Sequence, residues 1–168
     1  MKHPNVVNGN DLDWEHRKNG QDFEVWRQPL AQMAGGQQLG CSLYRQLPGK
    51  KAFPYHYHFG IEEAIYVLSG QAGLRIGDKT VSLGPGDYVA LPAGRETAHQ
   101  IANSGPDELV YLCFSTMVDP DIVAYPDSDK VGAIAGFVAG GPKTDRRLVA
   151  FFPRKAAVPY WTGEADED

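Results

Sequence analysis

The chain has 168 residues, of which 42% are hydrophobic and 22% are charged, a composition typical of a globular protein that buries its core without disulfide help. Its formal net charge is −5, and its longest basic groupings are the pairs Lys50-Lys51 and Arg146-Arg147, so a nucleic-acid partner, which needs clustered Lys and Arg, is not expected. No uninterrupted apolar run reaches the roughly 18 residues that a membrane helix needs, so no membrane partner is expected either.

The first 22 residues are polar and show neither helical nor strand periodicity. We expect them to form an irregular arm on the surface, anchored by Trp14. The arm lacks the apolar core of a signal peptide, which predicts a cytoplasmic protein. Cys41 and Cys113 both lie in apolar stretches, and we expect two buried thiols rather than a disulfide.

From Phe23 onward, short apolar and β-branched runs alternate with Gly, Pro and Asp, which is typical of strands joined by tight turns. A helical turn is expected only near residues 28–33. The predicted strands are residues 23–27, 37–46, 53–58, 63–68, 72–76, 80–83, 87–91, 98–103, 108–114 and 147–152.

Two turns make the strand order largely sequential. Gly77-Asp78 is expected to close a hairpin, and Gly84-Pro85-Gly86 another. The pattern indicates an antiparallel sandwich or barrel, and the length favours one domain over residues 1–168. An acidic tail, residues 163–168, is expected to fray.

The pair His56 and His58 carries the first chemical signal. On a strand, residues two apart share a face, so both imidazoles project into one space while Tyr55 and Tyr57 point away. Neutral imidazoles together with a carboxylate form a mixed nitrogen and oxygen site that suits Zn, Fe, Mn, Ni or Cu. A second segment supplies His99, on a strand that follows a Pro-x-Gly turn.

The first segment resembles the first motif of the cupin superfamily, Gly-x5-His-x-His-x3,4-Glu-x6-Gly. The residues that fit it are His56, His58, Glu63 and Gly70.

The second segment is similar to the second cupin motif, Gly-x5-Pro-x-Gly-x2-His-x3-Asn. The residues that fit it are Gly86, Pro92, Gly94, His99 and Asn103.

This resemblance implies an all-β fold, the double-stranded β-helix or jelly-roll barrel, with a core at about residues 37–117 between the irregular N-terminal arm and a C-terminal tail. It also implies that the two motifs lie on facing strands. Their ligands would be His56, His58, Glu63 and His99, which together would bind one divalent transition metal.

The chain departs from the motifs at two turns. Gly49 precedes His56 by one residue more than the first motif has, and four residues rather than two separate Gly94 from His99. A lengthened loop can bulge without moving the strand that follows, so we expect His99 to remain a ligand.

Glu62 is the alternative carboxylate. The six-residue interval to Gly70 selects Glu63, and strand parity points Glu62 outward. The remaining histidines, His3 and His16, lie in the arm and are expected to be exposed.

Among cupins, the chain is most similar to small bacterial single-domain members labelled sugar-phosphate-isomerase-like or auxin-binding-like. The shared stretches are residues 56–58, 62–70, 98–103, 125–128 and 160–164. The resemblance implies a small-molecule ligand and a homodimer formed through an edge strand or the N-terminal segment.

Four protein ligands leave one or two open positions on a five- or six-coordinate metal. We therefore expect an enzyme that isomerises or oxygenates a sugar, a sugar phosphate or a carboxylic acid. The alternative is a non-catalytic, metal-supported binding or sensing module, since the expected neighbours Ile65, Val67 and Ile101 supply no acid or base. Polar candidates for the pocket are Tyr44, Arg45, Tyr66, Arg75, Gln100 and Tyr111.

Overall fold

The computed structural model describes residues 3–136 and 145–164. Strands dominate it, as expected for an all-β protein, and the only α-helix among the described residues is α1 (Leu30–Met33). The strands are β1 (Glu15–Asn19), β2 (Phe23–Gln28), β3 (Leu39–Gln46), β4 (Tyr57–His58), β5 (Glu63–Ser69), β6 (Ala72–Ile76), β7 (Lys79–Leu83), β8 (Tyr88–Leu91), β9 (His99–Asn103), β10 (Leu109–Thr116), β11 (Asp121–Tyr125), β12 (Lys130–Ala135) and β13 (Leu148–Pro153). Short 3-10 helices are η1 (Gly9–Asp11), η2 (Arg95–Thr97), η3 (Pro126–Ser128) and η5 (Arg154–Ala156).

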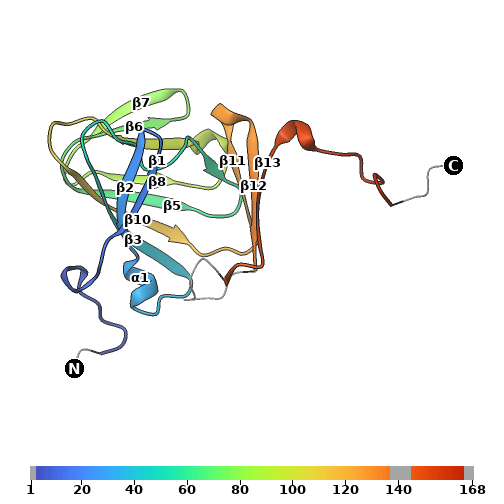
Figure 1. The fold of residues 1–168 in the computed structure, drawn as a ribbon. Coiled ribbons are helices and arrows are strands. Elements are labelled where there is room, and N and C mark those ends of the chain that lie inside the picture. The colour runs from blue at the N-terminus through green and yellow to red at the C-terminus, as the bar shows by residue number, and fades with distance from the viewer. Residues whose placement is uncertain (1–2, 137–144, 165–168) are drawn as a thin grey trace.

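The strands form antiparallel sheets that wrap into a barrel (Figure 1). One sheet has the order β1-β2-β3-β10-β5-β8, a second the order β13-β12-β11-β4, and a third the order β7-β6-β9. Strands far apart in sequence are therefore neighbours, as in the pairing of β3 with β10 and of β4 with β11. This architecture confirms the prediction of an all-β jelly-roll fold.

The core lies between the sheets and follows the two-residue period of the strands. On β5, Ile65 and Val67 are buried whereas Tyr66 and Leu68 are exposed. Leu74 of β6 and Tyr111 of β10 belong to the same core cluster. By the same alternation, the first residue of β5, Glu63, shares the inner face of the strand with Ile65 and Val67.

Gly70 directly follows β5 and adopts the left-handed region, at a φ of +82°. A Cβ at this position would lie 2.6 Å from the carbonyl oxygen of Glu108 and 2.8 Å from Cα of Leu109. Both the backbone angle and the close approach exclude a side chain, which is a local reason for glycine at the end of the first motif.

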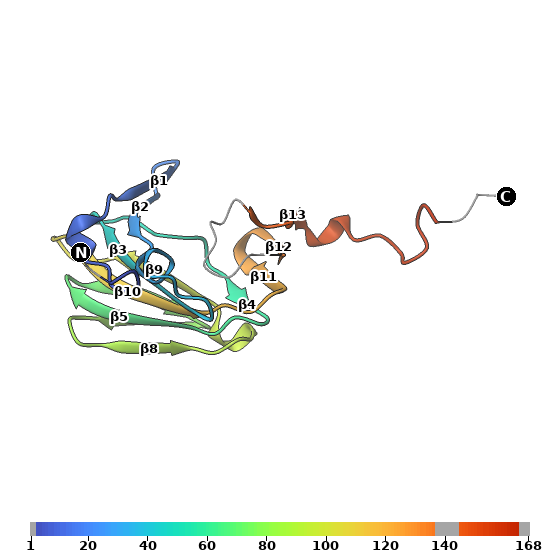
Figure 2. The same ribbon diagram turned by 90° about the horizontal axis from the view of Figure 1, so that it is seen from below.

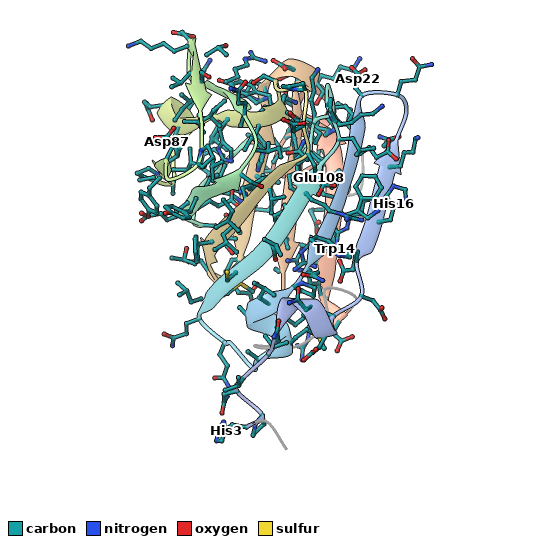
Figure 3. The ribbon with its side chains drawn as sticks, turned by 90° about the vertical axis from the view of Figure 1, so that its left-hand side faces the viewer. His3, Trp14, His16, Asp22, Asp87 and Glu108 are labelled. Carbon is teal, nitrogen blue, oxygen red and sulfur yellow. The ribbon has the colours of Figure 1, made fainter. Side chains whose placement is uncertain are left out.

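The N-terminal arm is more regular than expected. Its second half forms β1, which pairs with β2 in register from Glu15 opposite Arg27 to Asn19 opposite Phe23. Trp14 is anchored as predicted, since the guanidinium of Arg45 lies 4.6 Å from the centre of its ring. Figure 3 shows Trp14 and His16 against the body of the protein, whereas His3 lies at the far end of the arm.

Three further differences concern the strands and cysteines. The predicted strand at 53–58 is reduced to β4, and His56 before it forms an isolated β-bridge with His99 rather than a continuous ladder. Strands β11 and β12 were not predicted. Cys41 and Cys113 form no disulfide, as expected, but they are partly rather than fully buried.

The chain leaves the barrel after β13. The segment that follows runs away from the sheets in both ribbon views (Figures 1 and 2), and Tyr160 and Trp161 are 85% and 72% exposed. Of the predicted acidic tail, residues 165–168 lie outside the described residues. No helix in the described ranges is long and apolar enough to cross a membrane.

Candidate metal centre

His56 and His58 enter one cavity from a nearly extended segment. His56 exchanges two backbone hydrogen bonds with His99, its amide donating to the carbonyl of His99 at 3.0 Å and its carbonyl accepting from the amide of His99 at 2.8 Å. Two residues on, His58 pairs with Val123 of β11. Tyr55 and Tyr57 are buried in a separate apolar cluster, so the alternation of the strand places both imidazoles on the cavity side.

Glu63 stands at the start of β5 and faces these rings. Its Oε2 lies 3.7 Å from Nε2 of His56, 3.6 Å from Nε2 of His58 and 3.2 Å from Nε2 of His99. The four side chains are between 8% and 17% exposed. The neighbouring Glu62 is exposed, so the carboxylate that reaches the histidines is that of Glu63.

The spacing of these atoms suits a metal ion. Two ligand atoms about 2.1 Å from the same ion lie roughly 3 to 3.5 Å apart at tetrahedral or octahedral angles, close to the separations around Oε2. The ligand atoms of His56, His58 and Glu63 all lie within 4.8 Å of one another. His99 is not part of this close group. Its Nε2 nevertheless lies 3.2 Å from Oε2 of Glu63.

Backbone carbonyls orient two of the rings. Nδ1 of His56 lies 2.9 Å from the carbonyl oxygen of Pro54, and Nδ1 of His99 lies 3.0 Å from that of Thr97. A carbonyl oxygen can only accept, so each Nδ1 carries a proton and donates it. Nε2 of each ring then points at Glu63, where it can bind a metal once it carries no proton.

A carboxylate orients the third ring. Nδ1 of His58 lies 2.5 Å from Oδ2 of Asp121, which is 3% exposed. The other oxygen of Asp121 accepts hydrogen bonds from the amides of Gly60 and Ile61 at 3.1 and 3.3 Å. Asp121 is thus held on both oxygens and fixes the His58 ring with Nε2 turned inward.

Glu63 is ionised despite its burial. Burial raises the pKa of this carboxyl, but hydrogen bonds from His56 and His99 and the nearby charges of His58 and His56 lower it more, so that the pKa lies well below its usual range. A buried carboxylate among three imidazoles is the charge pattern that a divalent cation completes.

The two extra residues before His99 fall in the segment that contains η2. The turn begins at Gly94, whose φ is +131°, and Ala98 closes η2 by donating its amide to the carbonyl of Arg95. The last residue of η2, Thr97, provides the carbonyl that accepts from Nδ1 of His99. The insertion therefore leaves His99 on its strand and also supplies the group that orients its ring.

A cavity of about 310 Å³ opens beside the four side chains. Three of the polar residues predicted for it, Tyr44, Gln100 and Tyr111, do line it, as do the apolar Ile65 and Ile101. The others expected there, Arg45, Tyr66, Arg75 and Val67, are not among its lining residues.

The sequence reasoning missed several polar residues that line the cavity, five of which are charged or aromatic. Arg27 comes from β2, Asp121 and Tyr125 from the unpredicted β11, and Asp119 and Arg146 from segments beside β11 and β13. The ring of Tyr125 stacks on His56 with centroids 6.0 Å apart. The continuous run of Ile122, Val123, Ala124 and Tyr125, bounded by Pro120 and Pro126, was a usable strand signal, and it would have drawn attention to Asp121.

The chain resembles known proteins in sequence and in structure. A sequence model described as "Cupin domain" matches residues 42–115, the part of the chain that contains all four side chains of the cluster. No curated protein sequence matches the chain significantly.

Solved structures resemble the chain over most of its length. A protein from Acidithiobacillus ferrooxidans, provisionally named a sugar phosphate isomerase, is 25% identical with a TM-score of 0.76, covering 93% of this chain and 96% of that one. A cupin-superfamily sugar phosphate isomerase from Silicibacter pomeroyi is 25% identical with a TM-score of 0.69, covering 79% and 78%. A predicted oxalate decarboxylase from Thermotoga maritima shares the fold at 24% identity and a TM-score of 0.59, covering 67% and 99%.

Proposed function

We propose that this chain, which belongs to the cupin superfamily, is a metal-dependent enzyme. It binds one divalent transition metal through His56, His58, Glu63 and His99 and acts as an enzyme on a small oxygenated molecule. The observation that carries this proposal is the convergence of three Nε2 atoms on the buried carboxylate of Glu63, at 3.2 to 3.7 Å, beside an open cavity.

A bound divalent metal supplies a Lewis acid for a carbonyl or hydroxyl oxygen and, where it is redox-active, electron transfer to dioxygen. The protein's own residues prepare the cavity. Pro54, Thr97 and Asp121 hold the rings in the ligating orientation, and the carboxylate of Glu63 offsets part of the cation's charge. Zn, Fe, Mn and Ni all fit a donor set of imidazole nitrogens and one carboxylate.

The reaction we propose is an isomerisation or an oxygenation of a sugar, a sugar phosphate or a carboxylic acid. The names of the two most extensive structural relatives given above favour the sugar phosphates. Tyr44, Gln100 and Tyr125 line the cavity with groups that can hydrogen-bond the hydroxyls of such a molecule.

A non-catalytic binding or sensing module is the second candidate, and one observation favours it. Burial raises the pKa of both Tyr44 and Tyr111, the tyrosines deepest in the cavity. Their hydroxyls stay protonated at neutral pH and can donate hydrogen bonds, but neither is a base. An isomerase needs a base near the carbon-bound proton of its substrate.

Substrate turnover separates the two candidates. The protein, reconstituted in parallel with Fe, Mn, Ni and Zn, is incubated with a panel of sugars, sugar phosphates and carboxylic acids, while NMR follows each compound and an electrode follows oxygen. The enzyme proposal expects one compound to change, with oxygen uptake for an oxygenase and without it for an isomerase. Glu63→Gln should abolish the change, whereas Glu62→Gln should not.

Unaltered compounds throughout the panel, together with saturable binding of one of them, would replace the enzyme with the binding module. Turnover by Glu63→Gln at the rate of the unmodified protein would contradict the assigned site.

We also propose a homodimer. Apolar side chains are exposed on β13 and after it, among them Phe151 at 52%, Val158 at 67% and Trp161 at 72%, a surface that a second copy could cover. The single-domain assignment over residues 1–168 and the cytoplasmic location stay predictions from the sequence.

A further inference from the structure

Two arginines line the cavity that contains the histidine cluster. Arg27 lies on β2, and its side chain is 8% exposed. Arg146 lies just before β13 and is partly buried. Guanidinium groups are seldom buried without a partner, because removing the charge from water is costly. The partners of each arginine therefore indicate its role.

Arg27 is held in place by two hydrogen bonds. Its Nε donates to Oγ of Ser42 at 3.0 Å, and its Nη1 donates to Oε2 of Glu15 at 2.9 Å. A guanidinium carries five N–H donors, so these contacts fix the plane of the group without using its full capacity. The arrangement is that of a positioned donor rather than of a freely moving surface side chain.

Arg146 forms no hydrogen bond or ion pair with any other described residue. Burial lowers the pKa of its guanidinium, the carboxylates of Asp121 and Asp119 raise it, and the positive charge of Arg27 lowers it further. Both arginines line the same cavity, and each brings a positive charge to it.

The nearby carboxylates already have other partners. Asp121 accepts hydrogen bonds from His58, Gly60 and Ile61, and both oxygens of Asp119 accept from the amide of Gly136, at 2.8 and 3.1 Å. The carboxylate of Glu15 balances the charge of Arg27, and the carboxylates of Glu63, Asp119 and Asp121 balance a bound divalent cation together with Arg146. What remains available to a ligand is the set of N–H donors on the two guanidiniums that no described residue occupies, and such donors pair best with an anion.

We infer that Arg27 and Arg146 form an anion subsite that binds the carboxylate or phosphate group of the ligand in the metal cavity. This inference rests on the proposed function for the identity of the cavity as the ligand site, and it narrows the ligand to an anionic molecule. Guanidinium groups bind both anions through paired N–H donors. A cavity of about 310 Å³ accommodates a small molecule whose other oxygens lie near the histidine cluster.

Binding of inorganic phosphate and of malonate tests the inference. Each is titrated calorimetrically into metal-loaded and metal-free protein at constant ionic strength, with chloride as the reference anion. Saturable binding of phosphate alone would identify a phosphate subsite, and binding of malonate alone a carboxylate subsite. Binding of neither anion, with or without metal, would overturn the inference.

The variants separate this subsite from general charge effects. Arg146→Gln should weaken binding of the anion at least tenfold. Arg146→Lys keeps the charge but loses the paired donors, so its affinity for the anion should lie between that of Arg146→Gln and that of the unmodified protein. Arg147→Gln removes the same charge from the exposed neighbouring residue and should bind as the unmodified protein does. Equal affinity in Arg146→Gln and Arg147→Gln would contradict the subsite. Arg27→Gln also loses the bond to Glu15, so it is compared only after circular dichroism shows a native fold.

Metal content is measured on every sample. Anion binding that depends on Arg146 in a protein that takes up no metal would support the subsite and refute the proposed metal function. Normal metal content with anion binding unchanged in Arg146→Gln would refute the subsite alone.

Discussion

Nδ1 of His58 lies 2.5 Å from Oδ2 of Asp121, a residue 63 positions later in the chain. The contact links β4, which carries His58 of the first motif, to β11, which lies outside both motifs. Since Asp121 also accepts from the amides of Gly60 and Ile61, one buried carboxylate fixes both the loop before Glu63 and the ring of a proposed ligand.

Asp121→Asn should weaken metal binding by about 10- to 100-fold, the usual effect of removing an outer partner of a ligating histidine. The neutral amide keeps an oxygen for the backbone amides but no longer stabilises the oriented imidazole of His58. Dissociation constants for Zn²⁺ and Mn²⁺ are obtained by competition with a chelator. Asp127→Asn, which removes an exposed carboxylate paired with Arg75, is the control, and equal affinities in the two variants would refute the role of Asp121.

Gly70→Ala should lower the free energy of unfolding by about 2 kcal/mol or more, because alanine would have to adopt a positive φ and its Cβ would meet the backbone of Glu108. Gly84→Ala is the control, since a Cβ there has open space and no φ constraint applies. Denaturation in urea measures both. A loss in Gly70→Ala no larger than that in Gly84→Ala would contradict the account of the motif glycine.

Acid should remove the stability that Glu15 provides. Burial raises the pKa of this carboxyl, but hydrogen bonds and charges from Arg27 and Arg17 lower it more, so the folded value lies below the usual 4.5. The contribution is then present above about pH 4.5 and lost as the pH falls below it. Glu15→Gln should melt at a lower temperature than the unmodified protein at pH 7, and the gap should narrow towards pH 3. A gap that does not change with pH would show that the ion pair with Arg27 does not stabilise the fold.

Replacing the exposed aromatics after β13 should shift the proposed dimer towards monomer. Light scattering coupled to size-exclusion chromatography should give about half the mass for Tyr160→Ala/Trp161→Ala. Tyr88→Ala, which removes a ring that is 64% exposed on β8, should keep the dimer mass. A monomer before any substitution would reject the dimer outright.

The strands of the barrel could be predicted because glycine and proline separate its apolar runs. Residues 72–76 form β6 as expected, and β5 and β9 differ from prediction by only one residue. β1 could not be predicted in this way, because all five of its residues are exposed and it is held by backbone pairing to β2. Pairing between strands is not encoded in the local pattern of one of them.

The candidate site was predicted unevenly for a similar reason. His56 and His58 are recognisable because two residues on one strand share a face, and Glu63 and His99 through the motif spacing. Asp121, Arg27 and Arg146 enter the cavity only through the pairing of distant strands. Their residue types are common on surfaces, and nothing in the local sequence distinguishes Arg27 and Arg146 from solvent-exposed charges.

Metal analysis tests the central claim most directly. The protein is purified without an affinity tag or chelator, and its transition metals are counted by mass spectrometry beside two double variants, His56→Ala/His58→Ala and His3→Ala/His16→Ala. The account predicts about one transition-metal ion per chain in the unmodified protein and in the variant of the arm histidines, and almost none in His56→Ala/His58→Ala. An unmodified protein without metal, or a His56→Ala/His58→Ala variant that retains it, would contradict the account.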